Sequence, residues 1–99
     1  MRIAVPCTKD GTAVFDPFEH AYFVKIYDVN DGKISACQLV PTNGAVHSLL
    51  AAFLAARHVD LILCNVISDG TRRAVQEQEI SLVEGMSGDV DAVVERYLS

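Results

Sequence analysis

Apolar runs and turn residues alternate along the chain in a pattern that predicts short strands. The chain opens on an apolar run at 2–6, which Pro6 ends, and the run at 21–29 is rich in aromatic and β-branched residues. The sequence Asn-Asp-Gly at 30–32 follows directly and is typical of a β-hairpin. These patterns predict strands at 2–6, 21–29, 33–40, 60–64 and 79–84.

Apolar residues recur at helical spacing in other parts of the chain. Two such sets are Val46, Leu49, Leu50, Phe53 and Leu54, and Val90, Val93, Val94, Tyr97 and Leu98. We therefore predict helices at 47–57 and 88–98, and a more polar helix at 69–78. The segment 8–20 contains Lys-Asp-Gly and a proline, and it is predicted to be a long loop.

The order of the predicted elements indicates an α/β fold. A hairpin is followed by alternating strands and helices, in the order β-β-β-α-β-α-β-α. This order is typical of a mixed sheet with helices packed on it. We expect one domain over residues 1–99, with a mixed five-stranded sheet and three helices.

Four side chains that can bind metals are expected at one edge of this sheet. The chain reaches the same edge after the first strand, in the long loop, at the start of the first helix and after the fourth strand. That edge therefore gathers Cys7, His20, His47 and Cys64. It lies at the carboxyl ends of the parallel strands, where open α/β sheets bind ligands.

Other candidate residues are expected to be structural. Cys37 lies inside the predicted strand 33–40 and is interpreted as a small core residue. His58 follows the first helix at the opposite edge, where it would interact with the helix dipole. Arg72 and Arg73 could neutralise an anionic ligand, but we interpret them as a solvated helix face.

Charge and cysteine content narrow the class of partner. The net charge is −5, with 8 Lys and Arg residues and no basic run, so neither a nucleic acid nor an anionic membrane surface is an expected partner. The longest apolar stretch, 45–56, is too short to span a bilayer, and no export signal is visible. The 3 cysteines form no Cys-x-x-Cys pair. We therefore expect free thiols and a cytoplasmic protein.

Each of the four edge residues has a functional and a structural interpretation. Cys64 ends a strand just before a helix, where a thiol with a lowered pKa can act as a ligand, or it is a buried structural cysteine. His47 opens a helix and either binds metal or is an ordinary polar residue there. His20 is either a ligand or a solvated loop histidine, and Cys7 either lines a site or packs at the edge.

Landmarks along nearly the whole chain resemble one known family. In the first half they are the opening segment 1–6, the segment 18–23 with His20, and the hairpin at 27–32. In the middle they are His47 at a helix start and the segment 60–64 followed by Ile67. In the last part they are Gly85, the segment 87–90 and Tyr97-Leu98. They resemble the dinitrogenase iron–molybdenum cofactor biosynthesis family, which includes nitrogenase accessory factors and carriers. Asn65, Val66 and Ser68 stand where the family has a glycine-rich turn.

The resemblance implies a nitrogenase accessory factor-like fold with a ribonuclease H-like motif. It also implies a non-enzymatic binding or carrier module for an iron–sulfur or iron–molybdenum-type cluster, with Cys64 and His47 as metal ligands and His20 and Cys7 beside them. Iron–sulfur clusters usually take four thiolates, and this edge offers at most two. One chain would therefore carry a preformed cluster, or two chains would share a site. Cluster donor and acceptor proteins are the implied partners, and we expect an empty site after aerobic purification.

Two other functions remain open. A regulatory or interaction domain with a decayed site is favoured by the three replaced glycines, since glycine lets a bulky ligand approach the backbone. A small enzyme would need Cys64 and His47 as a thiol–imidazole pair within hydrogen-bond reach, with a third orienting group.

Overall fold

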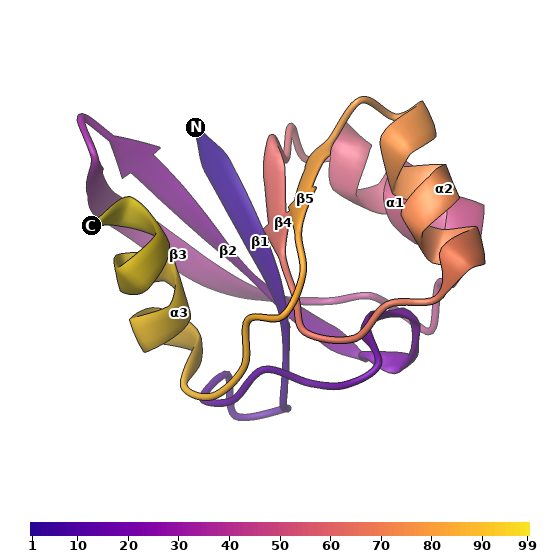
Figure 1. Cartoon of the computed structure of the whole chain (residues 1–99), viewed down its shortest axis with the longest axis horizontal. Coiled ribbons are helices and arrows are strands. Elements are labelled where there is room, and N and C mark those ends of the chain that lie inside the picture. Colours follow the sequence, from indigo (N-terminus) through magenta and orange to yellow (C-terminus); the bar gives the residue numbers. More distant parts are fainter.

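Five strands form one mixed sheet in the computed structural model, which describes residues 1–99 (Figure 1). Their order across the sheet is β3-β2-β1-β4-β5. The strands are β1 (Arg2–Cys7), β2 (Phe23–Asn30), β3 (Lys33–Pro41), β4 (Leu61–Leu63) and β5 (Ser81–Val83). The predicted α/β fold and its mixed five-stranded sheet are confirmed.

The pairing fixes which strand ends lie together. β1 is antiparallel to β2, as predicted, and β2 is antiparallel to β3. β1 is parallel to β4, with Ile3 opposite Leu61, and β4 is parallel to β5. The carboxyl ends of β1, β4 and β5 therefore meet at one edge of the sheet, which we call the rim.

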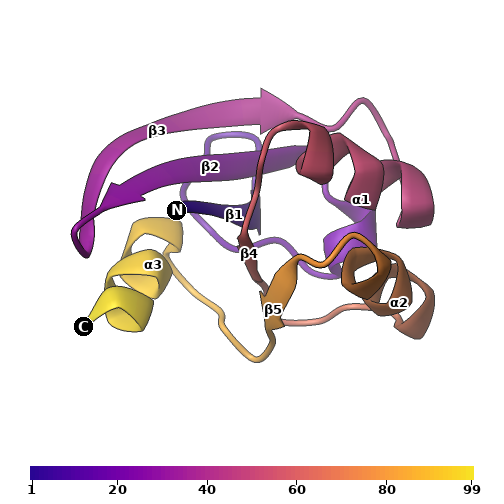
Figure 2. The same cartoon turned by 90° about the horizontal axis from the view of Figure 1, so that it is seen from above.

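Three helices cover the two faces of the sheet, and Figure 2 shows α1 and α2 on one side and α3 on the other. They are α1 (His47–Ala56), α2 (Asp69–Glu77) and α3 (Val90–Leu98). On the α3 side, the carboxylate of Asp91 accepts hydrogen bonds from Tyr27 and from Lys25, the latter at 2.9 Å. These bonds hold the first turn of α3 against β2.

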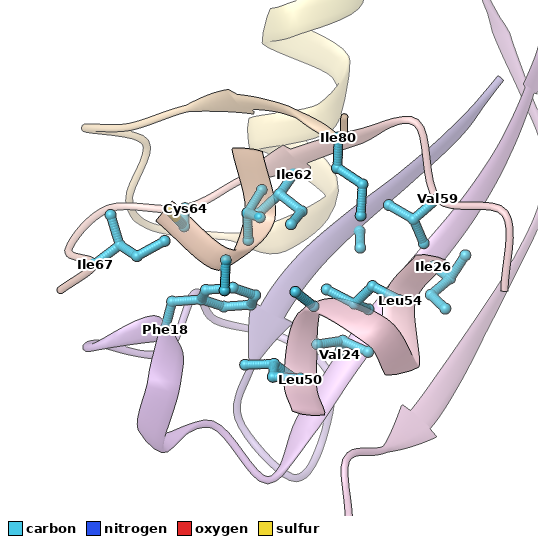
Figure 3. Close-up of a cluster of buried hydrophobic side chains, with 14 residues drawn as sticks. Phe18, Val24, Ile26, Leu50, Leu54, Val59, Ile62, Cys64, Ile67 and Ile80 are labelled. Carbon is cyan, nitrogen blue, oxygen red and sulfur yellow. The ribbon is translucent and has the colours of Figure 1, made fainter. Parts of the chain in front are cut away.

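Two hydrophobic cores follow from the alternation of side chains along the strands. The larger core, of 14 buried residues, lies under α1 and α2, and Figure 3 shows it. The smaller core, of 10 buried residues, lies under α3. The long loop contributes Phe18, which is fully buried in the larger core.

Two sequence-based interpretations need correction. The predicted loop contains a 3-10 turn, Phe18–His20, because burial of Phe18 fixes the backbone there. Cys37 was expected in the core, but it is exposed. The reason is that β3 is the outermost strand, so one side of it has no neighbour. Cys37 pairs with Tyr27 and lies on the α3 side, but it is beyond the residues that form the smaller core there.

Helices α1 and α2 end in the same way. After α1, His58 N donates to Ala55 O at 3.0 Å and Val59 N donates to Leu54 O at 3.2 Å, which is a Schellman motif. His58 adopts a left-handed conformation with φ 59°, and Glu79 does the same after α2 with φ 59°. Glycine is the usual residue at this position, because it has no Cβ to clash.

Glu79→Gly is therefore expected to raise the free energy of unfolding, by about 0.5–1 kcal/mol, because it relieves the left-handed strain. The measurement is urea denaturation at neutral pH. The control is Gln76→Gly, an exposed position inside α2, which is expected to lower the free energy of unfolding by a similar amount. If both substitutions lowered the free energy of unfolding, the left-handed strain at Glu79 would be contradicted.

Candidate functional site

The rim brings together parts of the chain that are far apart in sequence. Phe18 N donates to Val66 O at 2.8 Å, and Ser68 N donates to Glu19 Oε1 at 2.9 Å. Asn65 Nδ2 donates to Asp16 Oδ2 at 2.9 Å. The long loop is thus fastened to the segment between β4 and α2. All four sequence-predicted site residues lie at this edge, as the strand directions predicted, although their role in binding remains a prediction.

His47 is held in a defined orientation at the start of α1. Its Nδ1 lies 2.9 Å from Oγ1 of Thr71, a fully buried residue in the first turn of α2. A Cβ on Gly70 would lie 3.4 Å from the same nitrogen, at the limit of ordinary van der Waals contact, so the ring lies against the first turn of α2. His47 itself has φ 49°, a strained conformation for a residue other than glycine. Its Nε2 has no hydrogen-bond partner and is available to a ligand.

The start of α1 differs from the starts of the other two helices. Its N-cap residue, Val46, offers no side-chain hydrogen bond, and its first turn has no acidic residue. In contrast, the side chains of Ser68 and Asp89 cap α2 and α3. The first N–H groups of α1 are therefore left without a capping side chain, and they carry a partial positive charge that favours anions.

His20 lies on a hollow beside this helix start. The hollow has a volume of about 410 Å³. Its lining residues are Phe15, Glu19, His20, Ala21, Tyr22, Gly44, Ala45 and Val46. His20 supplies the imidazole on its wall, and His47 follows the lining residue Val46 in sequence, with its ring against Thr71 of α2. We call this pocket the imidazole hollow.

Cys64 lies at the rim, as predicted, but its side chain is not accessible there. Its side chain is fully buried in the larger core (Figure 3), and burial raises the pKa of its thiol to about 12, with Glu84 and Asp16 adding to the increase. Of the two interpretations left open by the sequence, the structure agrees with the buried cysteine and not with a thiol of lowered pKa. The physical reason is that the side chain points into the core under α1 and α2, while α2 begins only at Asp69.

Cys7 lies on the other face of the sheet. It belongs to the smaller core, and burial raises the pKa of its thiol to about 11, against a smaller opposing effect of Lys25. Cys7 and Cys64 thus share the rim but point to opposite faces. The structure does not bring the two thiols together.

Arg72 lies at the surface, and its guanidinium is fully engaged in ion pairs. Its Nε and Nη2 each lie 2.8 Å from an oxygen of Glu84, and it also pairs with Asp69. These two carboxylates raise the pKa of the guanidinium further above its usual range. Its charge is therefore already balanced, while Arg73 is exposed.

A second hollow, of about 610 Å³, lies next to the first and shares Phe15, Tyr22 and Gly44 with it. Its lining is Cys7, Thr8, Lys9, Phe15, Tyr22, Phe23, Pro41, Asn43 and Gly44. The hydrophobic pattern of the sequence does not distinguish these aromatic residues from core residues. One sequence feature does point to this hollow: Tyr22 and Phe23 directly follow the loop at the start of a strand, at the same edge as the histidines.

The possible metal-binding side chains of the rim do not form a preassembled site. No group of three His, Cys, Asp or Glu side chains is placed so that it could hold a metal ion. The accessible donors are two imidazoles and the N–H groups of α1. No helix in the structure has the length and apolar character needed to cross a membrane.

Comparison with solved structures identifies the same fold in other proteins. The protein PH0822 superposes with a TM-score of 0.93 at 20% identity, covering 99% of this chain and 88% of the other. A proposed dinitrogenase from Methanocaldococcus jannaschii gives 0.80 at 16% identity, covering 99% and 88%. The apo form of the orange protein from Desulfovibrio gigas gives 0.81 at 20% identity, covering 98% and 86%. At these identities the likeness concerns the fold alone.

Sequence comparison assigns the family. No curated protein matches the chain. The family model described as dinitrogenase iron-molybdenum cofactor matches residues 1–99, the whole of the sequence. This chain therefore belongs to the dinitrogenase iron-molybdenum cofactor family.

Proposed function

We propose that the protein is a non-enzymatic carrier that binds a preformed iron–molybdenum-cofactor-like or iron–sulfur cluster as cargo at the rim, between the start of α1 and the imidazole hollow. Membership of the family supports this proposal. The observation that carries it is the pairing of an uncapped helix start with a fixed imidazole at His47. We further propose that the carrier acts in the cytoplasm, with cluster donor and acceptor proteins as its partners.

His47 is the proposed metal ligand. Its Nδ1 is engaged by Thr71, so the ring is oriented and Nε2 is left for the metal. Outer hydrogen bonds of this kind fix the tautomer of metal-binding histidines. His20, on the wall of the hollow, is proposed as a second and exchangeable ligand.

The two rim thiols are proposed as ligands only in an opened form of the rim. Both are protonated at neutral pH, because burial raises the pKa of Cys64 to about 12 and that of Cys7 to about 11. A thiolate is the form that binds a metal. Loading onto Cys64 would therefore require exposure of its side chain and release of its proton.

His47→Ala is expected to lower the affinity for the cluster at least about tenfold, because it removes the oriented ligand. The measurement is anaerobic reconstitution with iron and sulfide, or with an isolated cluster, followed by iron analysis and visible absorption. The matched control is His58→Ala, an exposed histidine at the opposite edge of the sheet. Cys37→Ala provides an exposed-thiol control.

Equal loss of iron in the His58 variant, or unchanged binding in the His47 variant, would contradict the proposal. Cys64→Ala in the same series shows whether the cluster binds to the closed rim, in which Cys64 is buried, or to the opened form, in which Cys64 is a ligand. Binding that survives in this variant means that the cargo does not need Cys64 as a ligand. Binding that is lost means that the opened form, with Cys64 as ligand, is the one that carries the cluster.

A second candidate function is a regulatory or interaction domain with a decayed site. Exposed apolar side chains favour it, because Tyr22 and Leu49 are 68% and 69% exposed and Val46 is also exposed. Absence of colour after anaerobic reconstitution would favour this function over the carrier. The enzyme alternative has less support, since no hydrogen bond joins Cys64 to His47 and the thiol is buried.

A further inference from the structure

Strand β3 forms a long free edge of the sheet, and Figure 2 shows it along the outer margin. It is 9 residues long, whereas β5, at the other edge, has 3. Apart from the pairing with β2, no main-chain group of Lys33–Pro41 takes part in a hydrogen bond. A free edge of this length is a template for another strand.

The pairing with β2 determines which groups of β3 point outward. Thr42 N donates to Tyr22 O at 2.8 Å, just beyond the ladder. Hydrogen-bonded and non-bonded pairs alternate along an antiparallel ladder, so the main-chain groups of Gln38 face β2. Those of Cys37 and Leu39 face away from the sheet. The position of Pro41 is consistent with this assignment of outward groups. Proline has no N–H, and at this position an N–H would point away from the sheet, where it is not needed for pairing with β2.

The open part of this edge carries no charge. No Asp, Glu, Lys or Arg occurs in 34–40, although 21% of the chain is charged and its net charge is −5. A register shift next to Asp28 and Val29, with Lys33 nearby, protects the beginning of the edge, and Pro41 ends it. The segment 36–40 is left uncharged and unprotected, and it includes Leu39, which is 41% exposed.

We propose that β3 pairs antiparallel with β3 of a second copy of this chain, with the two-fold axis at Gln38. In this register, the outward groups of Cys37 bond to those of Leu39 in the second copy, and the reverse pair forms by symmetry. The two Gln38 side chains then face each other across the axis and can exchange amide hydrogen bonds. The two sheets become continuous, and the two rims lie at opposite ends, so both cargo sites stay open.

The edge suits a second copy because its sequence is complementary to itself. Cys37 meets Leu39, and Ala36 meets Val40, so every apolar side chain faces another apolar one. Two chains that each carry a net charge of −5 repel one another where acidic residues would meet. An uncharged edge avoids this repulsion. The interface is small, so we expect a reversible dimer rather than a permanent one.

Sedimentation equilibrium of the reduced full chain tests the association. From about 10 µM to about 1 mM, the average mass is expected to rise from 10.8 kDa towards twice that value. Leu39→Lys and Cys37→Lys place like charges across the axis, and both are expected to remain monomeric, with thermal unfolding confirming their fold. Lys33→Gln, outside the segment 36–40, is the matched control and is expected to dimerise. A monomeric wild type at 1 mM, or dimers in both Lys variants, would overturn the proposal.

Disulfide trapping tests the register. In the Cys37→Ser background, Gln38→Cys places two thiols opposite each other on the axis, where paired Cα atoms lie about 4.5 Å apart and a disulfide can form. Mild oxidation is expected to give a covalent dimer. Ala36→Cys in the same background pairs with Val40 and is expected to cross-link much more slowly. Equal cross-linking at both positions would show that the strands do not pair about Gln38.

Discussion

Phe18→Ala is expected to lower the free energy of unfolding by about 3–5 kcal/mol. Phe18 is fully buried and contributes an aromatic ring from the long loop to the core under α1 and α2 (Figure 3). Truncation to alanine removes this buried area and leaves a cavity that the sheet and the helices cannot close. The measurement is urea denaturation followed by circular dichroism.

The same substitution is expected to weaken the cargo site. Phe18 N donates to Val66 O, and the next residue, Glu19, accepts from Ser68 N. Loss of the ring loosens this attachment and thus the position of His20. For the free energy of unfolding, the control is Tyr22→Ala, which removes an aromatic ring that is 68% exposed, and the expected change is within about 0.5 kcal/mol. If both variants lost a similar amount of unfolding free energy, the loop would not be fixed by Phe18.

The sequence contained most of the fold because its local patterns agreed with one another. The hairpin at 30–32, the apolar runs and the helical spacing led to the correct element order and strand directions. Strand order across the sheet depends instead on long-range pairing, which no local pattern encodes. For this reason Cys37 was assigned to the core, whereas it lies exposed on the edge strand.

The candidate site was predictable in position but not in chemistry. The convergence of Cys7, His20, His47 and Cys64 at one edge follows from strand direction alone. Exposure depends on which way each side chain points and on what packs above it. Cys64 points under α1 and α2, and Cys7 points under α3, so the same edge buries two thiols and leaves two imidazoles accessible.

The burial of the two thiols predicts a loss of stability at alkaline pH. Burial raises the pKa of Cys64 to about 12 and that of Cys7 to about 11, from an ordinary value of 9.0. The folded state therefore keeps protons that the unfolded state releases near pH 9. The stabilisation is fully present below this pH and is lost as the pH rises towards the folded values. The free energy of unfolding is expected to fall by up to about 1.4 kcal/mol per pH unit for each thiol.

Urea denaturation between pH 7 and pH 10.5 measures this slope, with a reductant present and about half a pH unit between points. Cys64→Ala is expected to have a shallower slope than wild type, whatever its stability at neutral pH, because one titrating thiol is gone. Cys37→Ala, which removes an exposed thiol, is expected to keep the wild-type slope. An unchanged slope in the Cys64 variant would mean that this thiol is accessible in solution. It could then bind a cluster directly, without the opening of the rim that its burial otherwise requires.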